Sequence, residues 1–313
     1  MSPELLQKKE KIRKRLEPRI KELKFSLSRI KKSPLSMVGL CIILFFAIIA
    51  LLAPVIAPPK YPYDPYRIPR YGYSATPKPP SWEHPFGTTE GQYDIFYGVI
   101  WGTRTAFRIG FMVVGSIMVI GIILGSLSGY YGGIIDEVIM RIVDTFMSIP
   151  TLILAMALVT ALGHSLDKVM IALIIVGWPS YARLIRGDIL SVREETYIEA
   201  ARATGVSDFG IIFKHILPNA IYPLLIMASL DIGAMVLTAA ALSFLGLGAP
   251  IGYADWGQMI SFARNWIIGP PGKPLAYWYT VTIPGIFILL FVLGWNLLGD
   301  AFRDILDPKL RRK

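Results

Sequence analysis

The sequence predicts an all-α, polytopic membrane protein with six transmembrane helices. Of its 313 residues 54% are hydrophobic and only 17% are charged, whereas ordinary soluble domains carry about 25% charged residues. The mean hydropathy is +0.52. The apolar residues gather into uncharged runs long enough for a helix to cross roughly 30 Å of hydrocarbon. These runs are residues 37–57, 109–135, 145–163, 169–182, 232–254 and 274–299.

Residues 1–36 are predicted to form a basic amphipathic helix that leads into the first span. Apolar residues recur there every three or four positions, among twelve Lys and Arg residues and four Glu residues. Such a helix either lies on the anionic inner membrane surface or contacts a partner helix. The run 37–57 follows too long a basic stretch to be a cleaved signal peptide. We therefore expect it to remain as the first transmembrane helix.

The positions of Lys and Arg predict the orientation, because positively charged flanks tend to stay in the cytoplasm. With a cytoplasmic N-terminus and six crossings, 23 of these residues lie inside and 9 lie outside. Both termini, including the tail 304–313, are then cytoplasmic. The formal net charge of +10 is thus interpreted as a topology signal, and nucleic-acid binding is not expected.

Residues 58–106 are predicted to form an extracytoplasmic loop rich in Pro and Tyr. Ten prolines fall between residues 54 and 85, and proline lacks the N–H donor that a regular helix needs. The tyrosines of this stretch either anchor the loop at the membrane interface or contact a partner protein. The remaining five spans form a core over residues 107–303.

Two features are predicted within the second and third spans. Gly121, Gly125 and Gly129 share one helix face, which favours close packing of another helix; a substrate groove is the alternative. In the third span, Arg141 and Asp144 are three residues apart, so we expect them to pair. Pro150 should kink that helix, because its ring clashes with the carbonyl four residues back.

The fourth and fifth spans contain further candidates for a gate or pathway. The fourth reaches spanning length if it continues through Arg183 and Arg186. Pro179 lies inside it and, like Pro150, is a candidate for a kink at a gate. The fifth can start near Ile221 if Asp231 lies in its interior. An acid inside a span is a functional candidate by default. No acid or His lies at a similar depth, so a buried, hydrogen-bonded group is favoured over an ion relay.

Residues 188–219 are predicted to form a cytoplasmic helix-turn-helix, here called the two-helix loop. Good helix formers fill positions 194–204, and Gly205 suits the left-handed turn that ends a helix. Ser207 can cap a second helix that runs to a break at Leu217 and Pro218. The small side chains of Ala200 and Ala201 leave a low surface that fits a groove on another protein.

This loop resembles the EAA loop of the membrane subunits of bacterial and archaeal ABC importers. The resemblance rests on Glu199-Ala200-Ala201, on Gly205 and on Leu217-Pro218. It departs at His215, where the family pattern has an aliphatic residue. Other segments resemble the oligopeptide and dipeptide branch of that family. They are residues 84–88, 148–150, 177–183, 241–248, 296–300, 303–304 and 306–308.

The resemblance implies a permease subunit with a type I ABC importer fold in the inner or cell membrane of a bacterium or archaeon. Implied partners are a homologous second permease, two cytoplasmic ATPases, an extracytoplasmic binding protein and the lipid bilayer. The loop would dock on an ATPase, with Glu199 as a polar contact and Gly205 as the turn. Ala200 and Ala201 would give close approach, and Leu217 and Pro218 would end the loop. Di- or oligopeptides are the implied substrate, and oligosaccharides or nickel are the alternatives.

No sequence motif points to catalysis by this chain. The one Gly-Lys pair, Gly272-Lys273, precedes Pro274 and is not part of a phosphate-binding loop. We expect no cofactor and no metal site, and ATP hydrolysis would have to come from other subunits. An ion-coupled secondary transporter is a weaker hypothesis, because internal repeats are not visible and Asp231 is solitary. A scaffold protein would not explain the two-helix loop.

Overall fold

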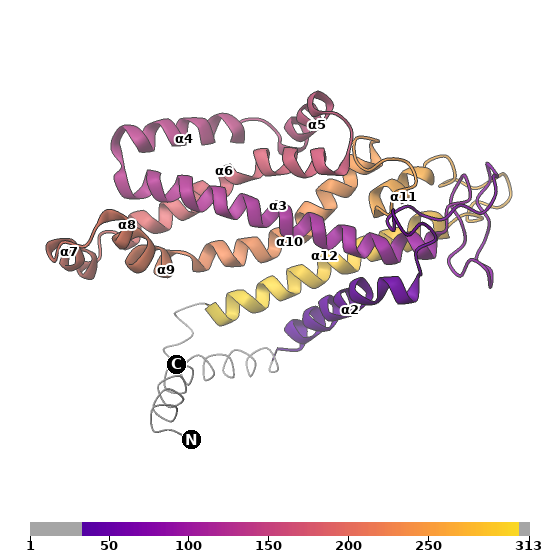
Figure 1. The fold of residues 1–313 in the computed structure, drawn as a ribbon, viewed down its shortest axis with the longest axis horizontal. Helices are drawn as coiled ribbons and strands as arrows, with labels where there is room; N and C mark the ends of the chain where they lie inside the picture. The colour runs from indigo at the N-terminus through magenta and orange to yellow at the C-terminus, as the bar shows by residue number, and fades with distance from the viewer. Residues whose placement is uncertain (1–32, 307–313) are drawn as a thin grey trace, which may run out of the picture.

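The computed structural model describes residues 33–306. The predicted basic helix before residue 33 and the tail beyond residue 306 lie outside the described residues. Within them the chain is helical and contains no strand. Figure 1 shows the long helices running side by side as an elongated bundle. The two-helix loop lies at one end of this bundle, and the long connections before α3 and before α12 lie at the other.

Five helices of the described chain are long and apolar enough to cross a membrane, and a bent pair brings the number to six if it counts as one span. The bent pair consists of α4 (Gly133–Met147) and α5 (Thr151–Leu162). The predicted fold class is confirmed. The five long helices are α2 (Pro34–Ile56), α3 (Ile95–Tyr131), α6 (Leu166–Val192), α10 (Tyr222–Phe244) and α12 (Tyr279–Leu306).

The third span is not the single kinked helix that the sequence predicted. α4 and α5 are bent by 91° relative to each other at the break between Met147 and Thr151. Pro150 precedes α5, has no N–H to continue the helix, and disfavours helical backbone at Ile149. The last turn of α4 closes on Ser148, whose hydroxyl donates to the Thr145 carbonyl at 2.7 Å.

The predicted pairing of Arg141 with Asp144 is wrong. Arg141 instead lies 3.9 Å from Glu137 on its own helix, with both side chains exposed. Asp144 forms an ion pair with Arg183 of α6. One further pair fastens the start of α4, because Arg186 of α6 binds both carboxylate oxygens of Asp136. These contacts hold α4 against α6 along two turns.

The helix α3 begins at Ile95, so the loop predicted over 58–106 is shorter than expected. The carboxylate of Asp94 caps the helix, accepting from the Tyr97 amide at 2.8 Å. Its other oxygen is 2.8 Å from Nδ1 of buried His84. At about 1.5 Å per residue, the 37 residues of α3 are longer than the hydrocarbon layer is thick. The first turns of α3 carry charged side chains, so a search for uncharged runs does not detect this part of the helix.

Glycines bring α3 and α6 into close contact, as the spacing of Gly121, Gly125 and Gly129 predicted. A Cβ atom at Gly121 would lie 3.1 Å from the Ala182 amide nitrogen. A Cβ atom at Gly129 would lie 3.0 Å from the Arg186 carbonyl oxygen. Contacts this short leave no room for a side chain, so the two helices can approach only because these positions are glycine.

Two predicted span boundaries are wrong at the end of the bundle away from the two-helix loop. α10 ends at Phe244 and not at residue 254, because Gly246 adopts φ +85 and turns the chain. A short helix that the sequence did not predict follows, α11 (Trp256–Phe262), with Asp255 accepting from the Gln258 amide at 2.8 Å. α12 then starts at Tyr279, five residues later than the uncharged run at 274.

Candidate functional site

The two-helix loop consists of two short helical segments that meet at a glycine. The first is α7 (Thr196–Ala203). Gly205 has φ +81 and open space around its Cβ position, so its backbone conformation and not crowding requires glycine. The second segment runs without a gap through α8 (Asp208–Gly210), η1 (Ile211–Ile216) and α9 (Leu217–Ala220). Ser207 caps it, as predicted, accepting from the Gly210 amide at 3.3 Å.

The second segment passes through Pro218, so the break predicted at Leu217 and Pro218 is wrong. The turns of η1 that precede it are π-helical, and this wider helix carries its hydrogen bonds from residue i to i+5. Pro218 follows these turns in the first turn of α9, a position where proline is tolerated. The break falls instead at Ile221, immediately before α10.

The inner faces of the two segments pack on each other through apolar side chains. Ile198, Ile211 and Ile216 are fully buried, and Ala201 is 9% exposed. Ala201 therefore faces the inside of the loop, contrary to the surface contact that the sequence predicted for it. Glu199 and Ala200 are exposed, Leu217 is half-buried and Pro218 is exposed. The predicted contact residues thus divide between an inner and an outer face.

Two aromatic rings on the outer face were missed by the sequence analysis. Phe209 is 71% exposed and Phe213 is 46% exposed, and their ring centroids are 4.4 Å apart. Their spacing of four residues on one helix face was the available signal. Exposed aromatic pairs beside small and polar side chains are typical of protein interfaces. The exposed residues of the loop, here called its outer face, thus include Glu199 and Ala200 on α7 and Phe209 and Phe213 on the second segment.

The two-helix loop is fastened to the end of α3 on both sides. The Tyr130 hydroxyl donates to Asp208 Oδ1 at 2.6 Å. The Arg193 guanidinium, just after α6, donates to the Gly129 carbonyl at 2.9 Å. The loop is therefore joined to α6 by the chain and to α3 by hydrogen bonds. A displacement of the loop must move both helices or break these bonds.

Asp231 lies inside a span and is hydrogen-bonded there. The Tyr181 hydroxyl of α6 donates to Asp231 Oδ2 at 2.8 Å, and Asp231 is half-buried.

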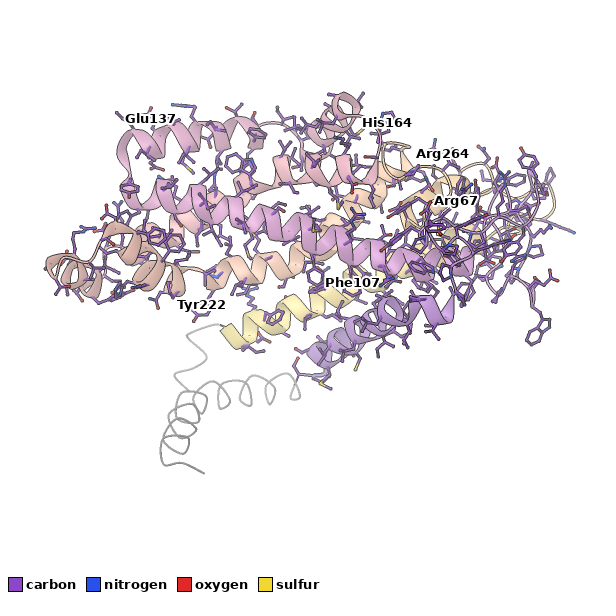
Figure 2. The ribbon with its side chains drawn as sticks, viewed as in Figure 1. Arg67, Phe107, Glu137, His164, Tyr222 and Arg264 are labelled. Carbon is purple, nitrogen blue, oxygen red and sulfur yellow. The ribbon has the colours of Figure 1, made fainter. Side chains whose placement is uncertain are left out.

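Figure 2 shows that His164 lies near the bundle end that carries Arg67 and Arg264. Among residues 33–306, no group of three or more His, Cys, Asp or Glu side chains is placed to hold a metal ion.

The other two gate candidates adjoin the contact between α4 and α6. Pro150 is exposed at the break between α4 and α5, whereas Pro179 is buried within a continuous α6. The rings of Phe146 and Trp178 are 5.9 Å apart, which brings the last turn of α4 beside the neighbour of Pro179. Asp231 approaches α6 from α10, so the three candidates do not form one site.

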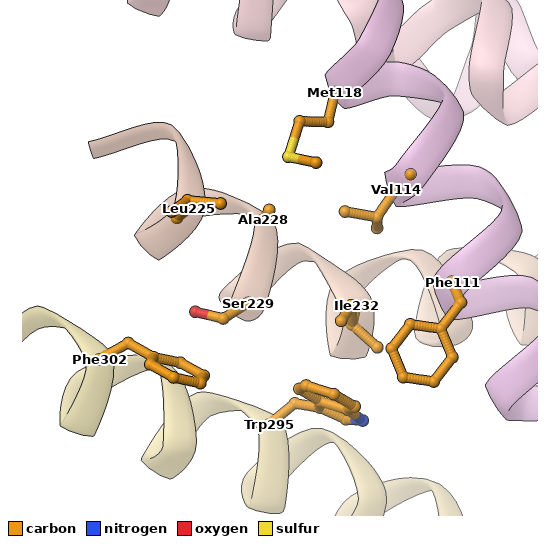
Figure 3. A pocket seen from close by; sticks show the side chains of 10 residues that line it. Phe111, Val114, Met118, Leu225, Ala228, Ser229, Ile232, Trp295 and Phe302 are labelled. Atoms are coloured by element: carbon orange, nitrogen blue, oxygen red, sulfur yellow. The ribbon is translucent and has the colours of Figure 1, made fainter. Parts of the chain in front are cut away.

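An apolar cavity of about 400 Å³ lies between α3, α10 and α12. Figure 3 shows side chains of these three helices converging on it, with Ser229 as a polar group among them. The Ser229 hydroxyl donates to the Ile226 carbonyl of its own helix at 2.7 Å. The cavity is therefore apolar, and no titratable side chain lines it.

Comparisons with known proteins agree with this arrangement. Residues 121–312 match the family described as binding-protein-dependent transport system inner membrane component. Residues 25–80 match the N-terminal transmembrane domain of oligopeptide transport permease C.

Individual relatives align over most of both chains. A dipeptide transport system permease protein of Alkalihalophilus pseudofirmus is 41% identical over 286 residues, 91% of this chain and 90% of the relative. A probable D,D-dipeptide transport system permease protein of Escherichia coli is 43% identical over 280 residues, 90% and 89% of the two chains. An oligopeptide transport system permease protein of Bacillus subtilis is 36% identical over 296 residues, 92% and 90%.

A solved structure shares the fold. A chain of the MetNI methionine ABC transporter in an inward-facing conformation superimposes with a TM-score of 0.53 at 22% identity. The alignment covers 67% of the present chain and 97% of that chain. At this identity the likeness concerns the fold alone.

Proposed function

Since the chain belongs to the family of binding-protein-dependent transport system inner membrane components, the permeases of ABC importers, we propose that it imports di- or oligopeptides with the energy of ATP hydrolysed by partner subunits. It forms the membrane passage together with a homologous second permease. Two cytoplasmic ATPases and an extracytoplasmic binding protein complete the transporter. The chain itself carries no catalytic role.

The observation that carries this proposal is the two-helix loop fastened to α3. Its outer face offers the exposed side chains of Glu199, Ala200 and Phe209 for docking on an ATPase. The hydrogen bonds from Tyr130 and Arg193 make the loop a rigid extension of the spans. Nucleotide-driven motion of the ATPase shifts the spans only if the loop is rigid, because a loose loop would interact equally with both states.

The ion pairs between α4 and α6 extend this coupling to the broken span. Arg183 and Arg186 lie on α6, which leads directly into α7, and they bind Asp144 and Asp136 of α4. A tilt of α6 therefore moves α4 and, beyond the break before Thr151, α5. We propose that this break, with Pro150 at its end, is part of the gate, and that Pro179 and Asp231 support the helices around it.

The proposed docking of the two-helix loop on a cytoplasmic ATPase also fixes the orientation of the chain in the membrane. The two-helix loop and the long connections lie at opposite ends of the bundle (Figure 1), so the loop faces the cytoplasm and the connections face the extracytoplasmic side. Both termini are cytoplasmic in this proposed orientation. The 9 Lys and Arg residues outside against 23 inside support this orientation.

The peptide substrate is supported by the names of the relatives, which include dipeptide and oligopeptide permeases. Oligosaccharide and nickel uptake by the same machinery are the alternatives. The test uses the purified transporter with its partners in proteoliposomes and compares labelled di- and tripeptides, oligosaccharides and Ni²⁺, with and without ATP. ATP-dependent peptide uptake is expected. ATP-dependent uptake of only sugar or only Ni²⁺ would make that molecule the substrate in place of peptides. Uptake driven by an ion gradient without ATP would refute the proposal.

A further inference from the structure

A second apolar groove runs along the first spanning helix. Its volume is about 490 Å³, within the range of sites that hold small molecules. Ala47, Ala50 and Leu51 of α2 form one wall, Phe107 of α3 forms another, and Trp295 of α12 lies at its far end. Arg104 stands among these otherwise apolar and aromatic side chains as the charged member.

The depth of Arg104 follows from its place on α3. The uncharged part of that helix begins at residue 109, five positions after Arg104. The Trp101 indole donates to the Ala57 carbonyl at the outer end of α2 at 2.9 Å, so Arg104, three residues further along α3, lies about 4.5 Å inside that end. The polar headgroup layer occupies about 5 to 7 Å on each side of the hydrocarbon. The long side chain of Arg104 spans this distance, so its guanidinium can reach a lipid phosphate on the side away from the two-helix loop.

Arg104 differs from the next arginine of the helix in its charge partners. Arg108 binds Asp167 at 2.7 Å. Arg104 has no acidic partner among the described residues, and its guanidinium lies 5.2 Å from the Trp101 ring. Its positive charge is thus free to meet an anion at the mouth of the groove.

The rings at the deep end close the groove within the hydrocarbon. Trp295 is 7% exposed, and its ring lies 5.7 Å from Phe111 in an edge-to-face arrangement. Both rings also line the cavity between α3, α10 and α12, where Figure 3 shows them next to each other. They therefore divide a groove on the side away from the two-helix loop from a cavity that extends toward that loop.

We propose that this groove binds one phospholipid, with the phosphate at Arg104 and one acyl chain lying along α2 toward Trp295. In the orientation proposed above, the lipid belongs to the outer leaflet. A chain already in the bilayer gains no transfer free energy from entering an apolar groove. Packing against the groove walls holds the chain, and the attraction between the phosphate and Arg104 selects a phospholipid over an uncharged lipid.

The test measures lipid binding by native mass spectrometry on the intact transporter after detergent washing. The probes are phosphatidylglycerol and diacylglycerol with the same acyl chains. We expect one tightly retained phosphatidylglycerol per chain and weaker retention of diacylglycerol. Arg104→Gln should weaken phosphatidylglycerol binding roughly five-fold, the effect of one arginine near the membrane surface. Its matched control is Arg108→Gln, which removes an arginine already paired with Asp167 and should leave binding unchanged.

A second variant tests the acyl-chain site without changing charge. Ala50→Phe fills the groove and should abolish the retained lipid, whereas Ile48→Phe adds bulk on an exposed face of the same helix and should not. Unchanged lipid retention in Ala50→Phe would overturn the proposal, as would equal effects of Arg104→Gln and Arg108→Gln. A third outcome would also overturn the proposal: the unaltered transporter retains no lipid, and the Ala50→Phe transporter loses a protein subunit. That result would assign the groove to a helix of a partner subunit.

Discussion

The hydroxyl of Tyr130 donates to Asp208 Oδ1 at 2.6 Å and so joins the last turn of α3 to the second segment of the two-helix loop. The two residues are 78 positions apart in the chain. Because α3 also packs on α6 through glycine contacts, the loop is held by two spanning helices. This attachment to two helices supports the proposed coupling of the loop to an ATPase.

Removal of this hydrogen bond should weaken coupling without weakening docking. Tyr130→Phe keeps the ring and loses the hydrogen bond to the Asp208 carboxylate, and a hydrogen bond to a charged group contributes about 1.5 to 3 kcal/mol. We expect the transporter to assemble normally and to move fewer peptides per ATP hydrolysed. The measurement is the ratio of peptide uptake to phosphate release in proteoliposomes. Tyr131→Phe, at the adjacent position on α3, is the control. An unchanged ratio in Tyr130→Phe would show that the bond carries no coupling.

The ion pair between Asp136 and Arg186 should stabilise the attachment of α4. Asp136→Asn removes a charge-assisted pair that is about 20–30% exposed, and such bonds contribute roughly 1.5 to 3 kcal/mol when shielded from water. We expect a lower melting temperature of the purified transporter and partial recovery in the swap Asp136→Arg with Arg186→Asp. Glu137→Gln removes an exposed pair at 3.9 Å and should change the melting temperature little. Equal effects of the two single variants would contradict this account.

The turn at Gly205 should depend on backbone conformation. Gly205→Ala places a Cβ atom at φ +81, where nothing else crowds it, and the left-handed conformation costs an Ala about 1 to 2 kcal/mol. Gly205→Asn should cost less, because Asn tolerates this region. The amount of ATPase that co-purifies with the chain should be highest for the unaltered chain with Gly205, lower for Gly205→Asn and lowest for Gly205→Ala. A steric role would instead predict that Asn, the larger residue, is the worse of the two.

Buried Asp255 should make stability depend on pH. Burial raises the pKa of Asp255 to about 6, above the ordinary value of about 3.9. The folded chain therefore binds this proton more tightly than the unfolded chain, and its stability falls as the pH rises from about 4 to 6. Asn at this position caps α11 but does not titrate. The melting temperature of Asp255→Asn should consequently fall less over this interval than that of the unaltered chain, and parallel profiles would contradict the assignment.

Uncharged runs and glycine spacing predicted the features that depend on local sequence. The long spans, the contact at Gly121, Gly125 and Gly129, and the turn at Gly205 are of this kind. The start of α3 was missed because residues 95–108 are helical but carry Arg104 and Arg108, which interrupt the hydropathy signal.

Features that depend on contacts between distant segments were not predictable. Pro150 locates the break after Met147, but no local feature gives its 91° angle, and the partners that hold α4 on α6 through Asp136 and Asp144 come from a distant segment. Arg141 is nearer to Asp144 in sequence than Arg183 is, so a local rule selected the wrong partner. Likewise, the motif around Glu199 identifies the two-helix loop but does not say that Ala201 faces inward.

The central claim, that the outer face of the two-helix loop docks on an ATPase, is tested most directly by co-purification from membranes. Ala200→Trp adds bulk to that face, and Phe209→Glu places a charge where an exposed ring stands. Loss of a central interface contact costs about 2 kcal/mol or more, which is roughly a thirty-fold loss of affinity at 25 °C. Ala75→Trp, at an exposed alanine near the opposite end of the bundle, is the matched control.

The account predicts that both loop variants retain the second permease and lose the ATPases, while Ala75→Trp retains all partners. Recovery of the ATPases in equal amounts from both loop variants and the control would contradict it.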